Sequence, residues 1–168
     1  MVEYIIPIKG LCDGDHQYTY KIDDEFFRSF EHFDIEKGLL NLIIDLTKES
    51  TLMDFRFQFK GNVELQCDRC LDKFNMNIEN SFRLIVKYGE IYEEVSDEII
   101  TIPSSQNNIE LRQLIYEYIN LMVPIKKVHP DDDFGKTTCN KEMIIQLNKY
   151  SEQKSDPRWD ALKNIKLE

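Results

Sequence analysis

Two long segments of alternating apolar and polar residues occupy the middle of the chain. From residue 55 to 65 the odd positions are apolar or small and the even positions are polar, whereas from 74 to 88 the even positions are apolar apart from Asn80. A period of two is that of a β-strand, whose side chains point alternately to the two faces of a sheet. We therefore predict two long antiparallel strands in a hairpin, with a bulge or kink at Gly61 and at Asn80.

The segments on either side predict a mixture of shorter elements. Four more strands are expected, the first two as a hairpin: residues 2–8, 17–22, 39–46 and 99–102. Helices are expected in four places: after a capping Asp23 or Asp24, from a capping Asn107 to Pro124, around 141–150, and from Asp156-Pro157 onward. The acidic segment 90–98 is predicted to be an exposed loop.

With 168 residues the chain is long enough for one well-buried core. We expect a single domain over residues 1–168, of which 1–90 are mainly β and 91–168 contain the acidic loop, a helix and a helical tail. The fold class is α+β: a mainly antiparallel sheet with long bent strands forming a hairpin, one amphipathic helix and short C-terminal helices.

Charge and cysteine content restrict the environment and the partners. The net charge of −10 argues against a protein that coats nucleic acid through a general basic surface, and suits a basic partner such as a ribosomal protein. The chain has no apolar run of membrane-spanning length, and the segment at its start resembles a strand rather than an export signal. Four widely spaced cysteines fit reduced or metal-bound thiols, so we expect a cytoplasmic protein.

Cys67 and Cys70 lie between the two long strands, in a Cys-x-x-Cys turn that can direct two sulfurs to one point. Thioredoxin-type motifs place the first cysteine at the start of a helix, and no helical pattern occurs here. A structural zinc site needs two further ligands, for which Cys139 and His129 are the candidates, with Cys12 as an alternative to His129. The simpler interpretation is that these cysteines are buried small residues that bind no metal.

Three features in this order give the chain a family resemblance. They are Cys67-Asp-Arg-Cys70 after a strand, Val123-Pro-Ile-Lys-Lys-Val-His129 followed by Cys139, and Asp156-Pro-Arg-Trp-Asp-Ala-Leu162. Together they resemble the YceD-like family, described as large ribosomal RNA subunit accumulation proteins, over about residues 40 to 168. The resemblance implies a role in 23S ribosomal RNA accumulation and large-subunit assembly, with ribosomal RNA or a basic ribosomal protein as the partner and no established catalytic residue.

Five residues are candidates for contact with RNA or a protein partner. Trp159 and Arg158 form a pair suited to stacking or gripping, and Lys126 and Lys127 form a small basic spot that Arg69 could join. The alternative is that Trp159 packs on the protein's own core and that the basic residues are merely solvated.

Hydrolysis is the rival class of function. Asp131, Asp132 and Asp133 could hold magnesium in a nuclease that matures ribosomal RNA. Clustered acids in a polar loop are usually solvated, and no His or Lys stands at a spacing that assigns a general base. We therefore expect that the protein is not an enzyme.

Overall fold

The computed structural model describes residues 4–30, 35, 37–151 and 158. The chain forms two compact units, each made of two segments. The first combines Met1–Leu65 with Lys73–Lys127, and the second combines Gln66–Asp72 with Val128–Glu168. That both units belong to one folding domain stays a prediction.

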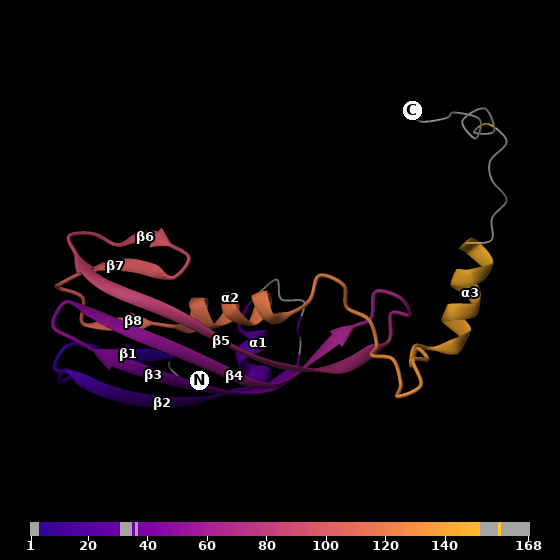
Figure 1. Cartoon of the computed structure of the whole chain (residues 1–168), viewed down its shortest axis with the longest axis horizontal. Helices are drawn as coiled ribbons and strands as arrows, with labels where there is room; N and C mark the ends of the chain where they lie inside the picture. The colour runs from indigo at the N-terminus through magenta and orange to yellow at the C-terminus, as the bar shows by residue number, and fades with distance from the viewer. Residues whose placement is uncertain (1–3, 31–34, 36, 152–157, 159–168) are drawn as a thin grey trace. The chain divides into compact units, whose positions relative to one another are not determined.

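The first unit is built on a six-stranded sheet (Figure 1), with strand order β2-β3-β4-β5-β7-β6. The pairs β2–β3, β3–β4 and β7–β6 are antiparallel, whereas β5 and β7 run parallel. The strands of this sheet are β2 Gly14–Ile22, β3 Gly38–Lys48, β4 Leu52–Gln66, β5 Lys73–Gly89, β6 Glu93–Ser96 and β7 Ile99–Pro103. A separate two-stranded sheet pairs β1 Ile5–Pro7 with β8 Asn108–Glu110.

The two long alternating segments form β4 and β5, neighbours in the sheet, as predicted. Phe55, Phe57 and Phe59 are buried along β4, while the polar residues between them are exposed. The register with β3 runs without a break past Gly61, so the bulge expected there is absent. On β5 the alternation is interrupted, because residues 79–81 are all exposed.

Two helices pack against the apolar side of this sheet and complete an α+β fold. Helix α1, Asp24–Arg28, begins after Asp23, whose carboxylate accepts the backbone N–H of Glu25. Helix α2, Arg112–Met122, contributes Tyr118, whose ring lies flat against Phe82 at 4.3 Å and edge-on to Phe57 at 5.2 Å. The fold class predicted from the sequence is confirmed.

Three sequence expectations in this unit are wrong. Asn107 does not start a helix, because Asn108–Glu110 pairs with β1 as strand β8 and α2 begins only at Arg112. Strand β1 therefore does not form a hairpin with β2, which pairs with β3 instead. The acidic segment 90–98 is not wholly a loop, since Glu93–Ser96 forms β6 against β7.

The described part of the second unit contains a turn, a loop and one helix. The turn, Gln66–Asp72, connects β4 to β5, and the loop 128–140 leads into helix α3, Lys141–Ser151. The helix predicted from Asp156, including Trp159, lies outside the described residues, of which Arg158 is the last. None of the helices in the described part of the chain combines the length and the apolar character needed to cross a bilayer.

Candidate metal centre

A tight turn at the end of β4 positions the first two cysteines. The backbone N–H of Leu71 donates to the carbonyl of Cys67 at 2.9 Å, and the N–H of Cys67 donates to the carbonyl of Asp72 at 3.0 Å. Leu71 adopts a positive φ of 63°, which lets the chain reverse within this short span. Both cysteine side chains are buried as a result.

A second turn brings His129 and Cys139 together. Asp132 organises it: one carboxylate oxygen accepts the backbone N–H groups of Phe134 and Lys136, at 3.0 and 2.8 Å. Gly135 has a φ of 73°, and the backbones of Asp131 and Thr137 form an isolated antiparallel bridge. The segment between His129 and Cys139 therefore folds back on itself as a small hairpin, whose ends carry the two candidate ligands.

Polar side chains join the two turns to each other. Arg69 donates to the Thr137 hydroxyl at 3.0 Å, and the same hydroxyl accepts the backbone N–H of Cys139 at 3.2 Å. The Asn140 amide donates to Asp72 at 3.2 Å, while its oxygen accepts the N–H of Glu142 at the start of α3. These contacts hold Cys139 beside the Cys-x-x-Cys turn.

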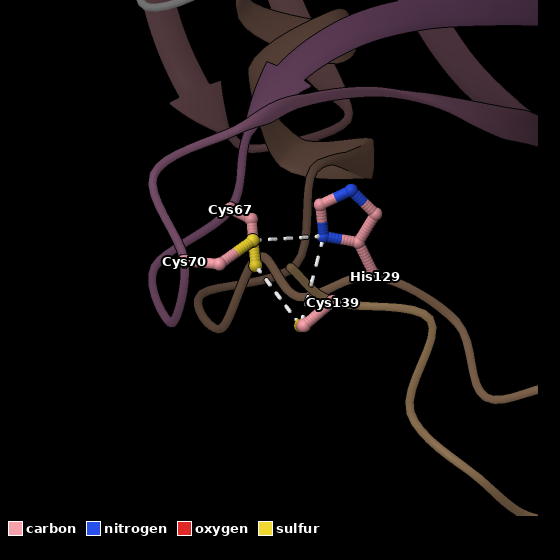
Figure 2. Close-up of side chains that lie close together, drawn as sticks. All are labelled: Cys67, Cys70, His129 and Cys139. Atoms are coloured by element: carbon pink, nitrogen blue, oxygen red, sulfur yellow. Dashed lines mark hydrogen bonds between the residues drawn. The ribbon is translucent and has the colours of Figure 1, made fainter. Parts of the chain in front are cut away.

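The result is a compact cluster of three thiols and one imidazole (Figure 2). The ligand atoms of Cys67, Cys70, His129 and Cys139 all lie within 4.8 Å of one another. The Cys67 and Cys139 sulfurs are 3.7 Å apart, and Nδ1 of His129 lies 3.4 Å from the Cys70 sulfur and 3.7 Å from that of Cys139. All four cysteines of the chain are free thiols.

These separations match a tetrahedral metal site. Zinc bonds of about 2.3 Å to sulfur and about 2.0 Å to nitrogen require roughly 3.8 Å between two sulfurs and roughly 3.5 Å between sulfur and nitrogen. The Cys67–Cys139 distance and the two distances from His129 fall close to these values, and every other pair of ligand atoms lies within 4.8 Å. The three cysteines and one histidine therefore form an arrangement compatible with a metal ion.

The surroundings of the two turn cysteines affect their pKa values in opposite directions. Burial acts to raise the pKa of Cys67, but the backbone N–H groups of Cys70, Arg69 and His129, together with the His129 ring, outweigh it and lower that pKa to about 6. Burial raises the pKa of Cys70, and the neighbouring Cys67 and Cys139 sulfurs act in the same direction. The lowered pKa favours the thiolate form of Cys67, which is the form that binds metals.

The three clustered cysteines are the only buried side chains among the described residues of the second unit. Helix α3 carries Ile145, Leu147 and Tyr150, which are exposed, and buries none of its residues. The described residues of this unit therefore form no hydrophobic core of ordinary size, and the contacts around the thiols dominate their interior.

The other candidate residues are distributed over both units. Lys126 is exposed and Lys127 half-buried in the first unit, while Arg69 belongs to the second, where it donates to Thr137. Arg158 is exposed. Trp159 lies outside the described residues, and Cys12 is exposed in the first unit.

One carboxylate of the acidic cluster in the rival hypothesis, that of Asp132, has a structural role. Asp132 uses one carboxylate oxygen to hold the turn at Gly135, and Asp131 takes part in the backbone bridge to Thr137. Sequence reasoning did not single out Thr137, Asn140 or Asp72. Only Asn140 had a recognisable signal, since an asparagine just before a helical pattern is a common cap.

Comparison with known proteins agrees with the motifs. Residues 55–166, more than half of the chain, match the family described as "Large ribosomal RNA subunit accumulation protein YceD". No curated protein and no solved structure matches the chain. The matched region contains the complete cluster, from Cys67 to Cys139. The chain belongs to the YceD family.

Proposed function

We propose that this protein is a non-catalytic cytoplasmic factor that supports accumulation of 23S ribosomal RNA and assembly of the large ribosomal subunit. The family match is the observation that carries this proposal, because the family is named for accumulation of large-subunit ribosomal RNA. The protein acts by binding ribosomal RNA or a basic ribosomal protein. An acidic chain with a net charge of −10 is suited to the second of these partners.

Within this function, Cys67, Cys70, Cys139 and His129 hold one structural zinc ion. Three soft sulfur ligands with one imidazole favour zinc over magnesium or calcium, which prefer oxygen. Four protein ligands also close the coordination sphere, which is typical of structural rather than catalytic zinc. Its role is to fix the two turns of a unit whose described part buries nothing except the three thiols.

Elemental analysis of the purified protein tests the zinc proposal. We expect about one zinc per chain, and its loss in Cys67→Ser, because removing one thiolate opens the tetrahedral site. Cys12→Ser is the matched control, since Cys12 is an exposed thiol of the first unit. Unmodified protein that contains no metal after purification without chelators would contradict the proposal.

The partner contacts are proposed to come from Arg158 and Trp159, from Lys126 and Lys127, and from Arg69. Arg158 and Lys126 have exposed side chains that can reach a ligand. Arg69 is the weakest of the set, since its guanidinium already donates to Thr137. A photoreactive residue placed at position 126 or 158 should crosslink to ribosomal RNA or to a ribosomal protein in cells.

Sedimentation tests the function as a whole. In a cell extract, an assembly factor should migrate with precursors of the large subunit, and its depletion should lower 23S ribosomal RNA relative to 16S. Migration only at the top of the gradient, with normal RNA levels after depletion, would refute the proposal.

A metal-dependent nuclease is the competing hypothesis, and the same preparation can test it. A nuclease should cut precursor RNA in magnesium and lose activity when Asp131, Asp132 and Asp133 become asparagine. We expect no cleavage by the unmodified protein or by the triple asparagine variant, because the Asp132 carboxylate already holds the turn at Gly135.

A further inference from the structure

Strand β6 lies at the margin of the six-stranded sheet, outside β7 (Figure 1). It pairs with β7 along one side, and no described strand pairs with its other side. The four residues of β6 are all exposed. A strand in this position offers backbone N–H and C=O groups to an extended polypeptide, which can add to the sheet as a further strand.

Apolar side chains accompany this open edge. Ile91 is 68% exposed, and Tyr92 and Val95 are each 57% exposed. The Tyr92 hydroxyl donates to the Glu94 carboxylate at 2.8 Å, which holds the ring on the surface. Three large apolar side chains within five residues give an incoming strand a surface to pack against, in addition to the backbone groups.

A cavity of about 570 Å³ lies beside the turn that follows β6. Asp97 and Glu98 from that turn line it, together with Phe82 of β5 and Tyr118 and Leu121 of α2. The Tyr118 side chain is 5% exposed, and its hydroxyl has no hydrogen-bond partner among the residues that the structure describes. A buried hydroxyl without a partner is costly, which points to a ligand group that completes it.

The charges around this cavity favour a cation. Arg83 also lines the cavity, but its guanidinium forms a bidentate pair with Asp54, at 3.0 and 2.8 Å. Arg56 is the other cation of the lining, and Glu98 also acts on the charge of Arg83, but the carboxylates of Asp54, Asp97 and Glu98 still outnumber the two guanidinium groups. Burial, together with the nearby charges of Glu98 and Glu117, raises the pKa of Tyr118 to about 12. Its hydroxyl is therefore neutral, and its oxygen can accept a hydrogen bond from a donor group of the ligand.

We propose that the edge of β6 and the cavity beside it bind an extended, lysine- and arginine-rich segment of a partner polypeptide. The segment adds as a strand along Glu93–Ser96, and one of its basic side chains enters the cavity to contact Glu98 and the Tyr118 hydroxyl. This inference rests on the proposed function and deepens it, because it specifies a basic protein rather than RNA as the partner at this surface.

The acidic residues of the β6 edge determine which molecules can pair with it. Short, charged and bulged strands usually protect a sheet edge from pairing, and β6 has all three properties, with its irregularity at Glu94 to Ser96. That protection acts against a second copy of this acidic chain and against RNA, since like charges repel. A basic strand meets attraction instead, so the same residues admit it.

Binding of defined peptides to the full-length chain tests the proposal. The probe is a labelled dodecapeptide of alternating lysine and valine with blocked ends. A lysine-proline peptide of equal charge is its control, because proline has no N–H for strand pairing. A glutamate-valine peptide controls for charge and an oligouridylate of the same length tests RNA. Affinity is measured by fluorescence anisotropy, and protection of the β6 amides by hydrogen exchange.

Matched variants locate the binding. Substituting Glu93, Glu94 and Glu98 with glutamine should weaken lysine-valine binding at least about tenfold. The same substitution at Glu49, Glu110 and Glu142 changes the net charge equally at exposed positions elsewhere and should have an effect below about threefold. Tyr118→Phe should weaken binding about fivefold while the melting temperature stays equal or rises, because the lost hydroxyl has no partner in the described part of the chain.

Three results would overturn the inference: equal weakening by both triple variants, equal binding of the lysine-proline peptide, or tighter binding of oligouridylate. These results are separable from failure of the proposed function. Loss of peptide binding with intact sedimentation alongside ribosomal precursors would refute only the edge site. Peptide binding without that sedimentation would refute only the assembly role.

Discussion

At Gly61, two backbones come so close that no side chain fits between them. A Cβ at this position would meet the carbonyl oxygen of Leu39 and would lie 2.7 Å from the Leu40 Cα. Gly61 pairs directly with Leu40 in the antiparallel register of β3 and β4. The glycine is therefore required for close approach of the strands, rather than for the bulge that the sequence suggested.

Gly61→Ala should lower the free energy of unfolding by about 1–3 kcal/mol, because the strands must separate to admit a methyl group. Urea denaturation measures the change. Asn62→Ala, at the next and exposed position of the same strand, should change stability by less than about 0.5 kcal/mol. Equal effects of the two substitutions would show that the close approach does not limit this site.

The pair of Asp54 and Arg83 makes stability depend on pH. The hydrogen bonds from Arg83 hold the pKa of the Asp54 carboxyl below its usual value. A carboxyl whose pKa is lower in the folded state stabilises the protein above the unfolded pKa of about 3.9, and loses this effect as the pH falls through the folded value.

Asp54→Asn should therefore lower the midpoint of thermal unfolding at pH 7, and the difference from the unmodified protein should shrink below about pH 4. Glu79→Gln is the control, since Glu79 and Lys60 form an ion pair whose side chains are 69% and 73% exposed, where solvent screening leaves little effect. A difference that stays constant down to pH 2 would contradict this account.

Several site residues could be anticipated because their chemistry is rare. Cys67, Cys70, Cys139 and His129 were expected to converge, since thiols three residues apart favour a shared ligand, and the structure brings the four together. The contacts of Arg69 with Thr137 and of Asn140 with Asp72, which join the two turns, could not be anticipated. Their side chains are common polar types and each contact links residues 68 apart, so only the capping role of Asn140 has a local signal.

At the scale of elements, strand β8 shows how pairing overrides a local signal. Asn107 and Glu110 have the spacing of a helix cap, yet Ile109 pairs with Ile6 of β1 and is 5% exposed. The carbonyl of Asn107 accepts the backbone N–H groups of Ile8 and Lys9, which extends the contact with β1. Helix α2 then begins after Leu111, without a side-chain cap.

Ile109→Ala should lower the free energy of unfolding by about 2–4 kcal/mol, because it leaves a cavity in a packed contact. Asn107→Ala should cost less than about 0.5 kcal/mol, whereas loss of a true helix cap typically costs about 1 kcal/mol. Chemical denaturation of both variants decides between the roles. A larger cost for Asn107→Ala than for Ile109→Ala would favour the cap.

The elements that could be predicted are those whose pattern is long. The alternation of β4 and β5 extends over more residues than chance produces, and both strands were predicted. Strand β1 was predicted, but its pairing with β8 was not, because the two segments lie about a hundred residues apart. The four residues of strand β6 are all exposed, and their sequence shows no alternation of apolar and polar positions. The strand is recognised only through its pairing with β7 in the structure.

At the scale of the whole molecule, the two units differ in what lies inside them. The first has an extended apolar core that includes Phe55, Phe57 and Phe59. The second, in its described part, buries only the three clustered thiols. Its stability should therefore depend on the proposed zinc far more than that of the first unit.

Removing the metal with a strong chelator should destabilise the second unit and leave the first unit folded. Amide protection should be lost at residues 66–72 and 128–151, while the strands β2 to β5 keep theirs, because their apolar core needs no ligand. Hydrogen exchange with mass spectrometry measures both regions in one sample, and added zinc should restore protection. Simultaneous loss of protection throughout the chain would contradict independent stabilisation of the second unit.

The sequence predicted that Cys139 and His129 meet the Cys-x-x-Cys turn, but not that these segments form a compact unit of their own. The turn Gln66–Asp72 belongs to the second unit although it connects two strands of the first. Alternation on both sides of Cys67 predicts a hairpin. The tip of that hairpin contacts Cys139 and therefore belongs to the second unit. Length and composition do not indicate that each unit is built from two segments separated in the sequence.

The separation of 72 residues between Cys67 and Cys139 affects how the protein emerges during translation. The Cys-x-x-Cys turn is synthesised early and must stay reduced while β5 to α2 are added. Only when Cys139 has left the exit tunnel can all three sulfurs meet, so binding of the proposed zinc ion by all its ligands has to follow synthesis of that residue. A nascent chain arrested before that residue would carry Cys67 and Cys70 without Cys139, and so without the complete ligand set of the proposed zinc site.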